Sequence, residues 1–278
     1  MTPLLFALTL FFVSLGSGAL GALLGLGGGL ILVPVLTLGL GVDIRYAVGA
    51  SIVSVIATSS GAAAAYVRER MANLRVAMFL ELATVSGALT GAFLAGVVSG
   101  RWLFLIFGLV MGYSALVMLR SRGDLAAPVA ADALSDSLGL HGSYWDASEG
   151  REVAYQVTGA RTGLGLMYVA GTVSGLLGIG SGALKVPAMD LAMRLPIKVS
   201  TATSNFMIGV TAAASAGVYF ARGDIDPFIA GPVSAGIVVG AFAGSRLLGR
   251  LQNRWLRRLF VAVLLVVSAQ MLLKGVLA

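Results

Sequence analysis

Two glycine-rich stretches that return at a fixed spacing are the residues best suited to chemistry in this chain. Gly25–Gly29 (GLGGG) is followed 153 residues later by Gly178–Gly182 (GIGSG), and a Val-Pro pair follows each stretch. A helix that restarts after such a break presents unpaired N–H groups and a partial positive charge. Two such ends aimed at one point would bind an anion. The candidate ligands are Gly27, Gly28, Gly29, Gly180, Ser181 and Gly182. The alternative is that these residues only permit tight helix packing.

Charged side chains close to the breaks, or within apolar segments, are the next candidates. Lys185 lies three residues into the second restarted segment, where the first half has Leu32. A Lys near the bilayer centre costs about 2.5 kcal/mol or more, and therefore marks a function or an ion pair. We expect Lys185 to bind an anion; the alternative is a snorkelling Lys, or one paired with Asp190. Asp190 and Glu81 are candidate coupling-ion sites, although Glu81 also suits an interfacial position or an Arg partner.

Polar side chains cluster in the third apolar segment of each half. Ser51 and Ser204 occupy equivalent positions, and Asn205 follows Ser204. Hydroxyl and amide donors suit the oxygens of an oxyanion, so these three residues are further candidate ligands. The alternative is hydrogen bonding between helices, which is common for such residues in membranes. For the other polar residues of these segments, Thr211 among them, the alternative is favoured.

The composition is that of a membrane protein that crosses the bilayer several times. Of 278 residues, 58% are hydrophobic and 11% are charged, against about 25% charged in soluble domains. The mean hydropathy is +0.95. The chain has no Cys and one His, His141, so we expect no metal site, no cofactor and no enzymatic centre. The net charge of +7 reports membrane topology rather than nucleic-acid binding.

Each half divides into five apolar segments, the second of which is short. The expected segments are 4–24, 29–41, 46–67, 76–99 and 102–119, then 162–177, 182–193, 199–220, 227–245 and 259–277. We read the first as a retained span rather than a signal peptide, because no basic region precedes it. The short segments reach only about 20 Å, less than the hydrocarbon core. The predicted fold is an all-α polytopic membrane protein of two repeats, 1–120 and 161–278, with broken helices at the glycine-rich stretches. A polar linker, 121–160, joins them and has the pattern of a small hairpin at 141–145 and 153–157.

The distribution of basic residues favours inverted repeats. If each half crosses the membrane an odd number of times, Arg45, Arg101, Arg222 and Lys274 lie on one side, and the other 14 of the 19 Lys and Arg, Lys185 excepted, lie on the other side. An even number of crossings divides the same residues equally. The positive-inside rule prefers the first arrangement. It predicts both termini outside and the linker in the cytoplasm; whether the first two segments of each half cross fully or are re-entrant stays open.

These motifs resemble the sulfite exporter TauE/SafE family of membrane transporters. The resemblance rests on Gly25–Pro34, its degenerate copy Gly178–Pro187, the polar segments around Ser51 and Ser204, and the two-half layout. It covers about 17–120 and 162–275. It implies movement of small sulfur-containing anions, such as sulfite or organosulfonates, across a prokaryotic plasma membrane. The second copy departs from the first at Ser181 and Lys185, so an exact substrate is not carried over.

The leading hypothesis is a secondary transporter that moves a small sulfur-containing anion by alternating access. The partners we expect are that anion and the lipid bilayer, with a homodimer as a further option and no nucleic acid. Three other functions stay open: a passive anion channel, a transporter of small carboxylates, and a membrane enzyme or assembly subunit. The absence of Cys and of paired carboxylates within the spans argues against an enzyme.

Overall fold

The two halves of the chain form the same series of helices. The computed structural model describes residues 2–68, 71–120, 132–248 and 251–277. The first half consists of α1 (Pro3–Leu24), α2 (Gly29–Pro34), the π-helical η1 (Val35–Gly39), α3 (Ile44–Arg68), α4 (Leu74–Ala95) and α5 (Gly100–Arg120). The second half repeats this order in α7 (Ala160–Leu177), α8 (Gly182–Pro187), the π-helical η2 (Ala188–Ala192), α9 (Ile197–Ala221), α10 (Pro227–Leu248) and α11 (Asn253–Leu277).

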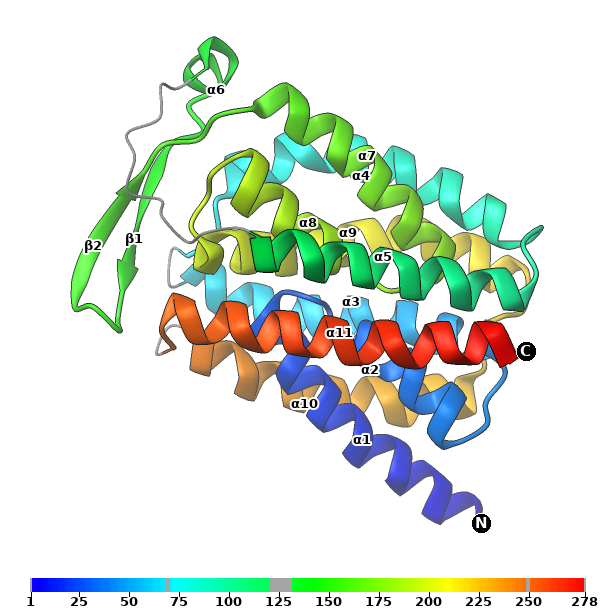
Figure 1. Ribbon diagram of the computed structural model, residues 1–278. Coiled ribbons are helices and arrows are strands. Elements are labelled where there is room, and N and C mark those ends of the chain that lie inside the picture. The colour runs from blue at the N-terminus through cyan, green and yellow to red at the C-terminus, as the bar shows by residue number, and fades with distance from the viewer. Residues whose placement is uncertain (1, 69–70, 121–131, 249–250, 278) are drawn as a thin grey trace.

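The helices form a bundle with both chain termini at one end and the linker at the other. The linker contains α6 (Ala133–Ser137) and an antiparallel hairpin of β1 (Gly142–Asp146) and β2 (Arg151–Tyr155), which stands at the left of Figure 1. The chain ends N and C lie on the opposite side of the picture. We call these the hairpin end and the terminal end. Among the described residues, α1, α4, α5, α10 and α11 are long and apolar enough to cross a membrane.

Glycines mediate the contact between the two halves. A Cβ added at Gly236, Gly240 or Gly244 of α10 would meet the backbone of α1, at Phe11, Leu15 and Ala19 in turn. Because the residue numbers of the contacts increase in the same direction along both helices, α1 and α10 run parallel. The equivalent pair, α4 and α7, does the same, since Gly171 and Gly175 meet the backbone at Thr84 and Ala88. Small residues at four-residue steps let membrane helices approach closely, and here they join helices from different halves.

The expected breaks lie between α1 and α2 and between α7 and α8. Gly25 and Gly178 end the long helices in the left-handed conformation, with φ of 71° and 65°, which a Gly adopts without a steric penalty. The restarted helices are short because Pro34 and Pro187 each lack an N–H, and a π-helical turn follows each proline. Gly25 and Gly178 thus place a chain reversal deep in the bundle of each half.

The hairpin is docked on the bundle rather than free. Tyr144, Leu140 and Val157 are buried in one apolar cluster with Met189 and Val199 of the second half. The Asn73 side chain, which caps α4, donates to the Leu140 carbonyl (2.8 Å) and to the Tyr155 hydroxyl (3.0 Å). The linker therefore closes the hairpin end over the start of α4 and of α9.

Candidate functional site

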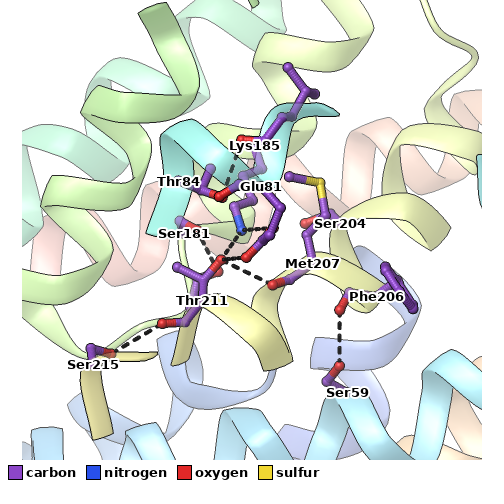
Figure 2. Close-up of polar contacts among 12 residues, drawn as sticks. Ser59, Glu81, Thr84, Ser181, Lys185, Ser204, Phe206, Met207, Thr211 and Ser215 are labelled. Carbon is purple, nitrogen blue, oxygen red and sulfur yellow. Dashed lines mark hydrogen bonds and ion pairs between the residues drawn. The ribbon is translucent and has the colours of Figure 1, made fainter. Parts of the chain in front are cut away.

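A buried chain of three polar side chains joins α4, α8 and α9. Lys185 Nζ donates to Thr211 Oγ1 at 2.6 Å, and Thr211 Oγ1 donates to Glu81 Oε1, also at 2.6 Å. Lys185 Nζ lies 3.8 Å from Glu81 Oε2. Figure 2 shows the three side chains converging, with Ser181 and Thr84 beside them. The Lys185 side chain is fully buried and that of Glu81 is 11% exposed, so a low dielectric surrounds both charges.

The local fold explains why these groups meet. Lys185 stands within the first turn after the second break, because its helix restarts at Gly182. The Lys185 side chain then reaches the middle of α9, where the Met207 carbonyl, 3.0 Å from Thr211 Oγ1, competes with Glu81 for the single hydroxyl proton. Glu81 reaches the same point from α4, which packs against α7. Without the break, a continuous helix would place Lys185 farther along the bundle, away from Thr211 and Glu81.

The Lys185–Glu81 pair leaves some of its hydrogen-bonding capacity unused. Glu81 Oε2 accepts no hydrogen bond among the described residues, although it is buried. An ammonium has three donors, and Thr211 takes one from Lys185. An anion that bound Lys185 would displace the Glu81 carboxylate from it. Because Glu81 stays in the buried site, the net charge of the site would change by one unit. Protonation of Glu81 would restore it.

The expected alternative pairing of Lys185 with Asp190 is wrong, and so is the expected Arg partner for Glu81. Asp190 Oδ2 instead accepts from Arg257 Nη2 at 2.6 Å. Residues five positions apart on a helix differ in direction by roughly 140°, so Asp190 faces α11 while Lys185 faces α9 and α4. Asp190 Oδ1 is buried without a hydrogen bond among the described atoms.

The polar residues of the third segments brace the opposite break. Ser51 Oγ donates to the Gly178 carbonyl at 2.7 Å, and Ser204 Oγ donates to the Gly25 carbonyl at 2.9 Å. Asn205 Nδ2 donates to the Ala22 carbonyl at 2.7 Å. These bonds supply donors to carbonyls at the ends of α1 and α7, where regular helical hydrogen bonding stops; the Ala22 carbonyl also accepts from the Gly25 N–H. In this structure the donors expected for an anion therefore serve the backbone, and their role as ligands stays a prediction.

The two breaks touch one another in the centre of the bundle. A Cβ on Gly182 would meet the Gly25 carbonyl and Leu26 Cα, and a Cβ on Gly29 would meet Ser51 Oγ. Gly27 and Gly180 face Ile208 and Val55, and Gly28 caps α2 with a φ of 67°. The backbone N–H groups of Gly180, Ser181 and Gly182 donate to no described backbone carbonyl. The glycines thus permit close packing and also leave amide donors near Lys185.

For Thr211, the sequence favoured hydrogen bonding between helices over ligand binding. Its equivalent in the first half, Thr58, donates to the Gly27 carbonyl at 3.2 Å. The equivalents of Lys185 and Glu81, 153 residues away in the other half, are Leu32 and Ser234. The hydroxyl is shared by both halves and the charges are not. The sequence signal for Thr211 is its spacing, because it follows Lys185 by the same number of residues as Thr58 follows Leu32.

Comparison with known proteins identifies the family. The sequence model described as Sulfite exporter TauE/SafE matches residues 10–271. The chain is 26% identical over 276 residues to the "Probable membrane transporter protein YunE" of Bacillus subtilis, covering 96% of this chain and 97% of the relative. It is 29% identical over 265 residues to a "Probable membrane transporter protein" of Xylella fastidiosa, covering 92% of each. No solved structure matches. The family match spans both repeats and both glycine-rich breaks, so the chain belongs to the sulfite exporter TauE/SafE family.

Proposed function

We propose that this chain is a secondary transporter that moves a small sulfur-containing anion, sulfite or a short organosulfonate, across a prokaryotic plasma membrane. That it is a membrane transporter follows from its family and its relatives. The substrate class comes from the family's name, and a single observation of the structure supports it: the fully buried Lys185 beside the second glycine break.

The chemistry of Lys185 favours a small oxyanion as cargo. Its ammonium already shares the Thr211 hydroxyl with one carboxylate, which supports a site that accommodates an oxyanion close to Lys185. The amides of Gly180, Ser181 and Gly182 add donors without adding charge. From the other half, the amide of Gly28 would contribute; those of Gly27 and Gly29 would first have to leave the Gly21 and Gly27 carbonyls to which they donate. Glu81 would take a proton when the anion replaces it, which would couple anion movement to protons.

Alternating access requires two halves that move against one another. The opposite directions of α1 and α7 along the bundle support the predicted inverted repeat, as does the parallel packing of α1 on α10 and α4 on α7. In such transporters the site lies at broken helices near the midplane and each half takes a turn as the mobile part. The breaks at Gly25 and Gly178, which touch one another in the centre of the bundle, are the candidates for such a site.

Anion-dependent thermal stabilisation of the purified protein tests this proposal. A ligand that binds the folded state alone, at 100 times its Kd, adds about 2.7 kcal/mol to the free energy of unfolding. We expect sulfite, thiosulfate or sulfoacetate to raise the melting temperature, and Lys185→Met to abolish the shift. Lys274→Met, which removes an exposed Lys of α11, is the matched control.

Other outcomes would favour a different cargo, a different binding site or a passive channel. Stabilisation by carboxylates alone would keep the transporter and change its cargo. A shift that survives in Lys185→Met would remove this residue from the site. In proteoliposomes, a substrate gradient that never drives counterflow would favour a passive channel over a carrier.

A further inference from the structure

A cavity of about 250 Å³ opens at the terminal end of the bundle. Its lining includes Arg45 at the start of α3, Ala95 near the end of α4, Leu176 near the end of α7, and Tyr219 and Arg222 near the end of α9. Val48 also lines it and packs against Gly178. The cavity is therefore separated from the second glycine break by Val48.

The charge of this cavity is positive. The Arg222 guanidinium is held in place: its Nε donates to Asp224 Oδ2 at 2.8 Å and its Nη1 to the Ala92 carbonyl at 2.8 Å. Asp224 offsets its charge. The Arg45 guanidinium is exposed and makes no hydrogen bond or ion pair among the described residues. The nearest carboxylate in the sequence, Asp43, accepts from the Arg45 backbone N–H instead. Within the part of the chain that the structure describes, Arg45 thus supplies a net charge without a partner.

The other half shows what such a cation binds. Lys198, which lies 153 residues after Arg45 and starts α9 as Arg45 starts α3, is fully buried at the hairpin end. Its Nζ donates to Asp146 Oδ1 at 2.7 Å and to Ser148 Oγ at 3.0 Å. The hairpin therefore places an oxyanion, a carboxylate of this chain, on the cation at one end. At the terminal end, no described segment places a carboxylate on Arg45.

From this equivalence we propose that Arg45, with Arg222 and the cavity between them, is a binding site for a small oxyanion at the terminal end. The anion would occupy the place that Asp146 holds at Lys198. This inference rests on the proposed function in one respect, since it makes the cavity the entrance by which the transported anion reaches Gly178. The binding itself does not depend on transport.

Thiol chemistry tests the site directly, because the chain has no Cys. Ala95→Cys would place one thiol in the cavity wall of the full-length protein. We expect a sulfonate-bearing methanethiosulfonate to modify it roughly tenfold faster than a trimethylammonium-bearing one, since a cationic cleft concentrates anions. Arg45→Gln should abolish this preference and Arg45→Lys should restore it. Arg101→Gln, which removes another exposed Arg of the same half, should leave it intact.

Protection by free anions completes the test. Methanesulfonate or acetate at millimolar concentration should slow modification of the Ala95→Cys protein, and the protection should disappear with Arg45→Gln. Equal rates for the two reagents, a preference that survives Arg45→Gln, or modification that neither anion slows would each overturn the inference. A protein that shows this protection but transports no sulfur anion would contradict the proposed function and leave the site standing.

Discussion

At the scale of single residues, one of two equivalent sites carries a charge pair that the other lacks. Lys185 of the second half meets Glu81 of the first half, and their equivalents 153 residues away are Leu32 and Ser234, yet the Thr between them has its equivalent in Thr58. A buried ion pair adds little to stability compared with apolar residues of the same volume, whereas one buried charge left alone is strongly destabilising. A pair present at one of the two equivalent sites alone is therefore better explained by function than by stability.

This asymmetry predicts the stability of Lys185 and Glu81 variants. We expect Lys185→Met or Glu81→Gln alone to lower the free energy of unfolding by about 3 kcal/mol, since each leaves its partner unpaired. The double variant should recover most of the loss, because no charge stays buried. All three should lose anion transport. Thermal unfolding and proteoliposome uptake measure the two effects; a double variant as unstable as both losses combined would show that the two side chains are not coupled.

At the scale of elements, the sequence predicted most of the fold. Every expected apolar segment corresponds to a helix, because the Gly and Pro residues that interrupt them are local signals. The linker also contains a hairpin, whose first strand begins one residue after the expected position and whose second strand begins two residues before it. The contacts of Glu81 with Lys185 and of Asp146 with Lys198 had no such signal. They join residues 104 and 52 positions apart, and the packing of α4 and of the hairpin decides them.

The contact between the two breaks predicts an effect of Gly182→Ala. The added methyl group would meet the Gly25 carbonyl and Leu26 Cα, which are backbone atoms and cannot rotate away. Overpacking of this kind costs about 1–3 kcal/mol, so we expect a lower melting temperature and weaker transport. Gly165→Ala in α7, where nothing lies within 4 Å of the new Cβ, is the control and should behave as wild type. Equal melting temperatures for the two variants would contradict the packing described at the breaks.

The docked hairpin predicts a pH dependence. Burial raises the pKa of Asp146, but hydrogen bonds from Lys198 and Ser148 outweigh it and leave the pKa below its usual value. The unfolded pKa is about 3.9, so the pair stabilises the fold fully above that pH and loses its contribution as the pH falls through the folded pKa. We expect Asp146→Asn to be about 3 kcal/mol less stable than wild type at pH 7.

Thermal unfolding between pH 7 and pH 3 checks this expectation. The difference between Asp146→Asn and wild type should shrink below about pH 4, where Asp protonates. Glu149→Gln, which removes one member of an exposed pair on the same hairpin, should match wild type throughout. A difference between Asp146→Asn and wild type that stayed constant with pH would show that the Asp146 charge does not stabilise the docked hairpin.

At the scale of the whole molecule, the two ends of the bundle differ in what faces the solvent. The hairpin end is covered by the linker and carries the buried pair of Lys198 and Asp146. The terminal end has an open cavity with Arg45, which has no partner among the described residues. Alternating access, as we propose it, would require that a single state differ between its two ends in this way.

Membrane topology is the prediction that belongs to this scale. We expect the hairpin end to face the cytoplasm, as the positive-inside rule requires. Single thiols at Ala147→Cys in the hairpin and Ser99→Cys between α4 and α5, both exposed, would report the two sides. A membrane-impermeant maleimide added to intact cells should label Ser99→Cys alone, and both after lysis. The reverse pattern would overturn the orientation.

The glycine seams between α1 and α10, and between α4 and α7, have a consequence for the history of the gene. Neither half holds its own first and third long helices together, because each finds its partner across the duplication. A half-length ancestor would have needed a second copy of itself, inserted the other way up, to cover those glycine faces. In the single chain the two halves differ at the paired site, since the second half has Lys185 where the first has Leu32, and the first has Glu81 where the second has Ser234. The same reasoning implies that the halves, expressed separately, should reassemble only when both are made in one cell.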